Sequence, residues 1–385
     1  MKNKIVELIA ANVEGLTAAE IADLIEIPPK PELGDFAFPC FRLAKTMRKA
    51  PQMIANDIKE AIGDVDFLQE IQVQGAYLNF FVKKELFIET MVTASMADDF
   101  GSSTEGNGQT ICIDYSSPNV AKNFHVGHLR TTIIGNSLYK IYSKLGYKVV
   151  RINHLGDWGT QFGKLIVAYK AWGSEEAVKK DGVAELMKLY VKFHEEAEKN
   201  PELNDEARAW FAKMEHGDEE ALKIWQWFKD ISLIEYKRTY DLLGMDFDYY
   251  LGESFYRDKT DDVVKRLTDA NLLTESEGAK IVNLDAYDMA PCLILKNDGS
   301  SIYATRDIAA IFYRKETYNF VKCLYVTGQE QKLHFKQVFK VVELLGNEWA
   351  KDQLVHIPYG LVSLEGAKLS TRSGNIIYAE DILLE

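Results

Sequence analysis

Two histidines, His125 and His128, stand three residues apart in the segment SSPNVAKNFHVGHLRTTIIGNSL, with Gly127 between them and Lys122 and Arg130 close by. The segment lies where a predicted strand ends and a predicted helix begins, so unpaired backbone N–H groups and the helix dipole would favour an anion. Two imidazoles can donate hydrogen bonds to phosphoryl oxygens that gain charge, and a glycine lets a nucleotide approach the backbone. The pattern indicates phosphate chemistry, although two capping or surface histidines fit it about equally well.

Paired histidines also bind zinc, which makes a metal site the competing interpretation. The spacing H-x-x-H lacks the one-turn geometry of zinc-binding helices, and no acidic or thiol ligand is nearby in the sequence. The four cysteines, Cys40, Cys112, Cys292 and Cys323, are far apart and form no CxxC pair. We therefore expect no resident metal ion, and reduced thiols in the core.

A second polar segment, GAKLSTRSGN, carries Lys368, Thr371 and Arg372 between glycines. A loop of this kind can close over a triphosphate and bring cations to the charge that develops in a water-poor site. Considered alone, the segment fits a solvated polar turn better.

Two further segments place polar side chains at a strand end or on one helix face. HLGDWGTQFG carries His154, Gly156 and Asp157, where the glycines would let a ring approach and the polar side chains could contact its edge or a ribose. SIYATRDIAA carries Tyr303 and Asp307 four residues apart, so that a phenol and a carboxylate could face a cationic ligand. A tight strand-to-helix turn and a capping or salt-bridging aspartate are the plain alternatives.

The elements that would position these residues form a parallel sheet. TICIDYSS is an apolar run typical of a buried strand, HVGHLRTTIIGNSLYKIYSKLGY has helical spacing, and KVVRINHLGDWG indicates a strand that ends in a glycine-rich loop. Strand, helix and strand in this order form a right-handed unit of a parallel sheet, whose ligands bind at the carboxyl ends of the strands. We expect an α/β, Rossmann-like domain over residues 106–385.

Two other regions are expected around this unit. Residues 1–105 are predicted to form a small α+β domain, with a helix over 41–62 and two strands around a turn at Gly75, followed by the linker GSSTEGNGQT. Residues from about 170 to 245 are charged, aromatic and helical, which predicts a helical insertion. Further strands are predicted in AKIVNLD, PCLILKN and KCLYVTG.

The composition is typical of a soluble globular protein of two or three domains, with 385 residues, 47% hydrophobic and 27% charged. The sequence lacks an apolar run of the roughly 18 residues that a membrane span requires, and its N-terminus lacks the apolar core of a signal peptide. We expect a cytoplasmic protein with no membrane partner. The net charge of -13 argues against a uniformly basic surface that coats nucleic acid, but it does not exclude a local basic track.

Taken together, the segments resemble the arginyl-tRNA synthetase family. HVGH resembles the HIGH signature of class I synthetases, and KLSTR resembles KMSKR in the form that this family often uses. SSPNVAK and GDWGTQFG are more specific for the family, and YATRDIAA and KLSTRSGN follow in the expected order. The N-terminal LGDFAFPCFRLAK is similar to the family's additional domain, which the resemblance implies binds the outer corner of the tRNA.

The resemblance implies a two-step reaction. Arginine and ATP with Mg²⁺ give arginyl-adenylate and pyrophosphate, and the arginyl group then passes to the terminal adenosine of tRNA(Arg). Both steps depend on positioning and charge stabilisation more than on a covalent nucleophile. The implied catalytic residues are His125, His128, Lys368, Lys122 and Arg372. The residues implied to bind ATP are His125, Gly127, His128, His154, Gly156, Asp157 and Lys368.

Arginine binding is implied at five positions, which are Asp114, Asn119, Tyr303, Asp307 and Gln331. Carboxylates and amides suit this ligand because a guanidinium presents a planar fork of five donors. The sequence departs from the family pattern at two positions. Thr371 stands where the class signature has its second lysine, so that Arg372 or Lys122 could supply the charge, and Asp114 stands where many relatives have glutamate.

Family members continue with a helical anticodon-binding domain after the KMSKR loop, whereas this sequence ends at Glu385. We therefore expect a fragment or truncated form, acting as a monomer, that binds ATP and arginine but charges tRNA poorly. Two alternatives remain. An enzyme that makes a free adenylate would not need the N-terminal domain and the insertion, and a non-catalytic RNA-binding paralogue would not need an intact HVGH segment.

Overall fold

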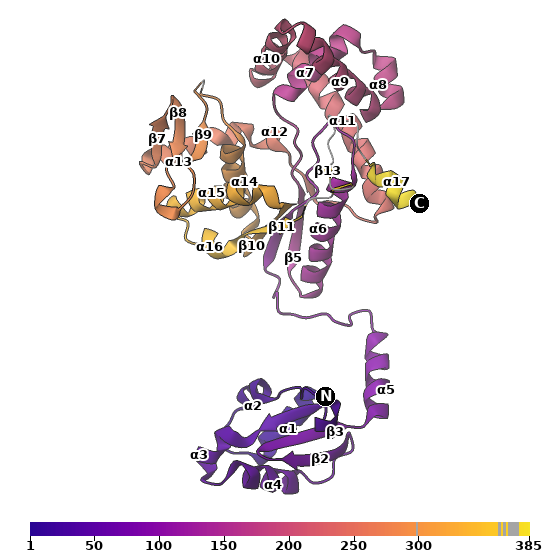
Figure 1. Cartoon of the computed structure of the whole chain (residues 1–385), viewed down its shortest axis with the longest axis vertical. Helices are drawn as coiled ribbons and strands as arrows, with labels where there is room; N and C mark the ends of the chain where they lie inside the picture. The colour runs from indigo at the N-terminus through magenta and orange to yellow at the C-terminus, as the bar shows by residue number, and fades with distance from the viewer. Residues whose placement is uncertain (298, 361–362, 365–366, 369–376) are drawn as a thin grey trace. The chain divides into compact units, whose positions relative to one another are not determined.

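The computed structural model describes residues 1–297, 299–360 and 377–385, and only the backbone of 363–364 and 367–368. The chain divides into two compact units, Met1–Gly101 and Ser102–Glu385, and each is described by itself (Figure 1). In the described part of the chain, each helix is too short or too polar to cross a membrane.

The first unit is a small α+β domain whose antiparallel sheet has the order β1-β3-β2. A tight turn joins β2 to β3 at Gly75, which has a φ of 61°, as the sequence predicts. The prediction of one continuous helix over 41–62 is wrong. Arg48 takes a left-handed conformation that ends the helical turn before it, and Pro51 begins a new helix. The elements are α1 (Lys2–Asn12), α2 (Ala18–Leu24), β1 (Phe36–Pro39), α3 (Ala44–Met47), α4 (Pro51–Ile62), β2 (Leu68–Gln74), β3 (Tyr77–Val82) and α5 (Lys84–Ser95).

The second unit is built on a five-stranded parallel sheet in the order β11-β10-β4-β5-β6. The strands are β4 (Thr110–Asp114), β5 (Lys148–Asn153), β6 (Tyr249–Tyr250), β10 (Lys322–Gly328) and β11 (Leu354–Tyr359). The predicted strand, helix and strand are present as β4, α6 (Val126–Lys144) and β5, which confirms the Rossmann-like fold class. The strand order reverses between β4 and β10, and such a switch point forms a ligand crevice at the carboxyl ends of the strands.

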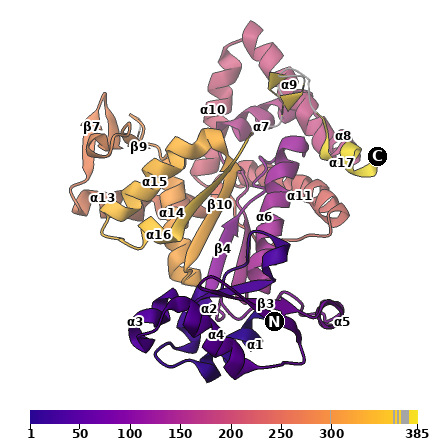
Figure 2. The same ribbon diagram turned by 60° about the horizontal axis from the view of Figure 1, so that its bottom comes forward.

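Side chains of β4 alternate between two hydrophobic cores, one on each face of the sheet. Ile111 and Ile113 belong to the core that includes residues of α6 and the helical insertion, whereas Cys112 belongs to the core with α14 (Tyr303–Tyr318) and α15 (Lys332–Leu344). Figure 2 shows α6 beside β4 and β10. Burial on both faces explains the continuous apolar run in TICID.

Helices fill the connection between β5 and β6. The predicted helical insertion is present, but it begins earlier than residue 170, at Thr160. Its helices are α7 (Thr160–Trp172), α8 (Glu175–Asp181), α9 (Val183–Lys199), α10 (Glu202–Glu215) and α11 (Glu219–Leu242).

The strands predicted after the insertion divide between two sheets. KCLYVTG forms β10 of the parallel sheet, whereas AKIVNLD and PCLILKN contribute β8 and β9 of a separate antiparallel sheet in the order β7-β8-β9. The remaining elements are α12 (Glu253–Tyr256), α13 (Thr260–Asp269), β7 (Leu273–Ser276), β8 (Ala279–Val282), β9 (Cys292–Leu295), α16 (Ala350–Gln353), β12 (Ser363–Leu364), β13 (Ala367–Lys368) and α17 (Ala379–Leu384).

Candidate active site

His125 and His128 lie at the start of α6, and hydrogen bonds from the backbone fix both rings. The Gly127 N–H donates to His125 Nδ1 at 3.1 Å, and the His125 N–H donates to His128 Nδ1 at 3.3 Å. The two rings stack with their centroids 3.9 Å apart. Because each Nδ1 accepts, the neutral form of each ring carries its hydrogen on Nε2 and can donate it to a ligand. A Cβ at position 127 would lie 2.9 Å from His125 Cε1, so glycine leaves room for this ring.

The surroundings favour the neutral form of both rings. Burial lowers the pKa of His128 well below its usual value, and the nearby His125 and Lys122 lower it further. Burial, followed by Lys122, also lowers the pKa of His125. At neutral pH the two imidazoles are therefore uncharged donors.

The backbone N–H groups in the first turn of α6 are engaged within the protein. The Val126 N–H donates to the Ile377 carbonyl at 3.0 Å, and the Gly127 N–H is held by His125. The expectation that free N–H groups would bind an anion here is therefore wrong. The imidazole Nε2–H groups and the dipole of α6 are the features of this helix start that can favour an anion.

The segments on both sides of residues 361–376 are attached to α6. Arg130 Nη1 donates to the Gly360 carbonyl at 2.6 Å, and the Val126 N–H donates to the Ile377 carbonyl at 3.0 Å. These contacts place Gly360 and Ile377, the described residues on either side of 361–376, beside the helix that begins with HVGH. The backbone of Lys368 belongs to β13, but its side chain, together with Thr371 and Arg372, lies outside the described residues.

A polar pocket of about 400 Å³ lies at the carboxyl ends of β4, β5 and β10. It brings together six of the predicted site residues, which are Asn119, His154, Gly156, Tyr303, Asp307 and Gln331. We call it the first pocket. Its other described lining residues are Ser117, Glu253, Arg306, Thr327, His334 and Phe335. A Cβ at position 156 would lie 2.0 Å from Asn119 Oδ1, so Gly156 is what allows these two loops to approach each other.

Three titratable side chains of the first pocket were missed by sequence reasoning. Glu253 forms an ion pair with Arg306, and His334 Nε2 donates to Asp307 Oδ2 at 2.5 Å. Burial raises the pKa of Glu253 to about 7; Arg306 opposes the shift and Asp307 adds to it. Each pair joins residues from different elements, so no local spacing in the sequence could have indicated it.

Asp114 differs from the other predicted arginine-binding residues, because it does not belong to the described lining of the first pocket. Its Oδ2 lies 2.8 Å from Arg314 Nη2, and its Oδ1 accepts from the Ser117 hydroxyl at 2.9 Å. Both carboxylate oxygens already have a partner inside the protein. The described lining of the first pocket therefore includes Asp307, which pairs with His334, but not Asp114.

Asp157, which was predicted to bind the nucleotide, is completely buried instead. Its Oδ2 accepts from Lys229 Nζ at 2.6 Å and from the Ser254 hydroxyl at 2.7 Å, and its Oδ1 accepts from the Ser254 N–H at 2.8 Å. Trp225 Nε1 donates to its backbone carbonyl at 2.7 Å. These contacts connect the GDWG loop to α11 and α12, so the carboxylate has a structural role.

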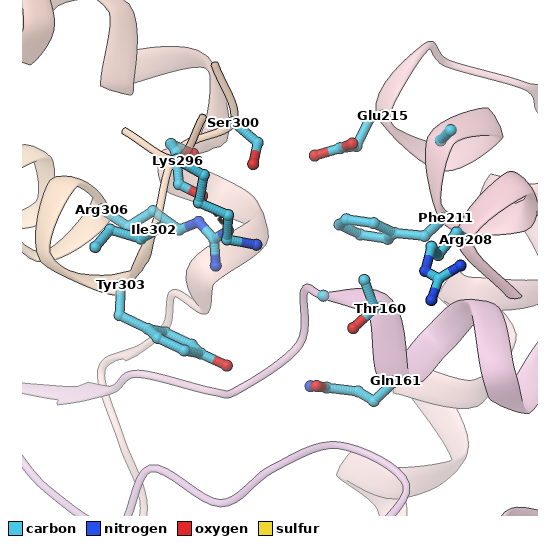
Figure 3. A pocket seen from close by; sticks show the side chains of 13 residues that line it. Thr160, Gln161, Arg208, Phe211, Glu215, Lys296, Ser300, Ile302, Tyr303 and Arg306 are labelled. Carbon is cyan, nitrogen blue, oxygen red and sulfur yellow. Dashed lines mark hydrogen bonds between the residues drawn. The ribbon is translucent and has the colours of Figure 1, made fainter. Parts of the chain in front are cut away.

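A second pocket, of about 470 Å³, adjoins the first, since Tyr303 and Arg306 line both. Figure 3 shows that one wall comes from the start of α14 and the segment before it, with Lys296, and the other from α7 and α10, with Arg208. The ring of Phe211 projects into the space between the walls. The second pocket thus combines aromatic rings with cations.

Three features together define the class to which this protein belongs. They are the order of the parallel sheet, the helical insertion after β5 and the paired imidazoles at the start of α6. Residues 91–385 match the family described as tRNA synthetases class I (R), catalytic domain, and this part of the chain is a class I aminoacyl-tRNA synthetase domain. Residues 3–82 match the arginyl tRNA synthetase N terminal domain. The chain belongs to the arginyl-tRNA synthetase family, whose members use ATP to join arginine to tRNA.

Individual relatives agree with this family. The arginine–tRNA ligase of Alkaliphilus metalliredigens is 55% identical over 384 residues, which cover 99% of this chain and 68% of the relative. The arginine–tRNA ligase of Clostridium perfringens is 57% identical over 386 residues, with 100% and 68% covered. The solved structure of Thermus thermophilus arginyl-tRNA synthetase has the same fold, with a TM-score of 0.69 at 20% identity over 99% of this chain and 68% of that one. The chain thus spans about two thirds of the length of these proteins.

Proposed function

We propose that the first pocket binds L-arginine and that the start of α6 binds the phosphates of ATP, so that arginine is activated as its adenylate. The observation that carries this proposal is the presence of Asp307 and Glu253 in one pocket with the phenol of Tyr303 and the amides of Asn119 and Gln331. A guanidinium is a planar fork of donors that suits carboxylate and amide oxygens, and an aromatic ring can also face a cation.

ATP is the substrate and binds together with Mg²⁺. Its phosphates would accept hydrogen bonds from uncharged imidazoles. The Nε2–H groups of His125 and His128 would form hydrogen bonds that strengthen as charge moves onto the departing pyrophosphate. Lys122 contributes a cation beside both rings, as its lowering of their pKa values indicates. His154 and Gly156 line the adenosine side of the first pocket.

The loop cations are assigned by the family signature. Lys368 and Arg372 belong to the segment whose two ends are attached to α6, at Gly360 and Ile377. We assign them to the phosphates of ATP, with Arg372 or Lys122 in place of the second lysine of the signature.

The second pocket suits the terminal adenosine of tRNA(Arg). It opens from the first pocket at Tyr303, so a nucleotide there would have its ribose close to an activated arginine. The Phe211 ring offers a surface on which a base can stack, and Arg208 and Lys296 offer charges for a phosphate. The transfer step would then need no movement of the adenylate.

ATP–pyrophosphate exchange in the presence of tRNA tests the proposal. Exchange should require arginine and should not occur with lysine, whose point charge fits the carboxylates poorly. Asp307→Asn should raise the barrier of arginine use by about 2–4 kcal/mol, because a charge-assisted hydrogen bond is lost. The matched control is Asp269→Asn, which removes an exposed carboxylate that pairs with Lys265 and should leave exchange within about twofold.

The alternatives predict different results in the same assay. A free-adenylate enzyme would catalyse the same exchange when tRNA is left out. An RNA-binding paralogue would bind tRNA without any exchange. Exchange of equal rate in the Asp307→Asn variant would contradict the assignment of the first pocket to arginine.

A further inference from the structure

Two helices bring a carboxylate and an imidazole together at the wall of the first pocket. Asp307 lies one turn from the start of α14, and His334 lies in the first turn of α15, and these two helices run side by side (Figure 1). His334 Nε2 is 2.5 Å from Asp307 Oδ2. Both residues line the first pocket, so they meet where a ligand would reach the carboxylate.

The hydrogen bond between them decides which carboxylate oxygen is left for a ligand. An ionised carboxylate can only accept, so His334 Nε2 carries the hydrogen and donates it. Among the residues that the structure describes, Asp307 Oδ1 has no hydrogen-bond partner. The bond between Cβ and Cγ of an aspartate has broad torsional preferences, so a carboxylate turns readily unless one oxygen is held. The donation from His334 therefore fixes the direction in which Oδ1 points.

The first turn of α15, which carries the donor, is fixed by packing on the sheet. Phe335 follows His334 and is buried. The centroid of its ring lies 5.0 Å from that of Tyr325 on β10 and 4.9 Å from that of His356 on β11. The imidazole is thus presented by a helix that is anchored to two strands, and such rigid elements hold a site more precisely than loops do.

Stability of the fold does not explain the pair of His334 and Asp307. Their side chains are 26% and 22% exposed, and a pair that remains in contact with water contributes little to folding. A guanidinium, in contrast, is a planar fork of donors and requires an aligned carboxylate. Loss of the alignment would therefore weaken ligand binding much more than it would weaken the fold.

We propose that His334 is a positioning residue for the substrate arginine, which holds Asp307 so that Oδ1 faces the guanidinium. This inference rests on the assignment of the first pocket to arginine. His334 acts through Asp307 and does not itself contact the guanidinium. Without the imidazole donor, arginine binding must also order the carboxylate, and this ordering lowers the affinity.

Two amide substitutions separate the position of the donor from its presence. The amide nitrogen of glutamine lies close to the place of an imidazole Nε2, whereas that of asparagine lies close to the place of Nδ1 and leaves Asp307 Oδ2 out of reach. In titration calorimetry, His334→Asn should bind L-arginine about tenfold more weakly than the unaltered chain, and His334→Gln should stay within about threefold of it. ATP affinity should be the same in both variants and the unaltered chain, which also checks that the variants fold.

A double variant tests whether His334 acts through Asp307. When Asp307→Asn is already present, the further change His334→Asn should alter arginine affinity by less than about twofold, because the group that His334 positions is gone. His216→Asn, which changes an exposed histidine, is the control and should leave arginine affinity unchanged.

Three results would overturn the inference. Unchanged arginine affinity in His334→Asn would mean that the hydrogen bond positions nothing. Equal losses in His334→Asn and His334→Gln would mean that a donor at the place of Nε2 is not what matters. A full tenfold loss that persists in the presence of Asp307→Asn would mean that His334 acts on the ligand directly. Failure of the unaltered chain to bind arginine, or full affinity in Asp307→Asn alone, would instead contradict the proposed function, and this inference would fall with it.

Discussion

At the scale of the residue, three imidazoles of the site share one orientation. His125 and His128 accept backbone N–H groups at Nδ1, and His154 accepts a guanidinium N–H at the same atom. Each ring therefore has an Nε2–H left for a ligand. At His125 and His128 a neutral donor suits the proposed contact with ATP, because it would stabilise the phosphates without adding charge that repels arginine.

The lowered pKa values of His125 and His128 predict how stability depends on pH. Below about pH 6.5, the unfolded chain takes up protons on these two residues while the folded rings resist them, so the free energy of unfolding falls as the pH falls. His125→Asn with His128→Asn removes this contribution, since an asparagine oxygen can replace Nδ1 as acceptor. In urea unfolding, the variant should therefore lose less stability than the unaltered chain between pH 7.5 and pH 5.

A control for this prediction is His216→Asn, because His216 is exposed on the surface. It should reproduce the pH dependence of the unaltered chain. A double variant at positions 125 and 128 with that same pH dependence would show that these rings are protonated equally in the folded and unfolded states.

The residues that the sequence could predict are those whose partners are close in the chain. The spacing of Tyr303 and Asp307 places both on one helix face, and both line the first pocket as expected. The ion pairs of Glu253 and Arg314 join elements far apart in sequence, so only the folded chain shows them. The pairing of Asp114 with the distant Arg314 was not predicted for the same reason.

At the scale of the element, Asp157 connects the helical insertion to the sheet. The GDWG loop follows β5, and the Asp157 carboxylate holds Lys229 of α11 and Ser254 of α12. Gly252 is required beside it, because a Cβ there would lie 2.3 Å from Asp157 Oδ1. The sequence indicated a glycine-rich turn at this place, but not that the turn anchors a helix of the insertion.

Lys229→Met should destabilise the chain by about 3 kcal/mol, because it leaves the buried Asp157 carboxylate without its cation. The matched control is Lys170→Met, which breaks the exposed ion pair between Lys170 of α7 and Glu220 of α11. That change should cost less than about 1 kcal/mol in urea unfolding. Equal effects of the two substitutions would mean that Asp157 does not anchor the insertion.

At the scale of the whole molecule, the two units have separate hydrophobic cores. The core of the first unit contains only residues between Met1 and Leu86, and the two cores of the second unit contain only residues after Thr110. Three strands of the parallel sheet of the second unit, β4, β5 and β10, were predicted from apolar runs, whereas β6 and β11 were not. The antiparallel β7-β8-β9 sheet was not, since short strands do not indicate which sheet they join.

We expect the chain to unfold in two transitions, one for each unit. Arginine or ATP at about 100 times its dissociation constant should stabilise the second unit by about 2.7 kcal/mol and leave the first unit unchanged. Differential scanning calorimetry with and without ligand measures both shifts. A single transition that moves as a whole would show that the two units unfold together.

In the proposed complex with arginine, the carboxyl group of Glu253, whose pKa is raised to about 7, would couple binding to the release of a proton. Roughly half of these groups hold a proton at neutral pH, and a cation entering the first pocket favours the ionised form, so binding releases part of a proton to the buffer. Apparent affinity for arginine should therefore rise as the pH increases through about 7.

The heat of binding should differ between phosphate and Tris buffers, whose ionisation enthalpies differ, and Glu253→Gln should abolish that difference. Equal heats for the unaltered chain in both buffers would mean that Glu253 keeps one protonation state throughout.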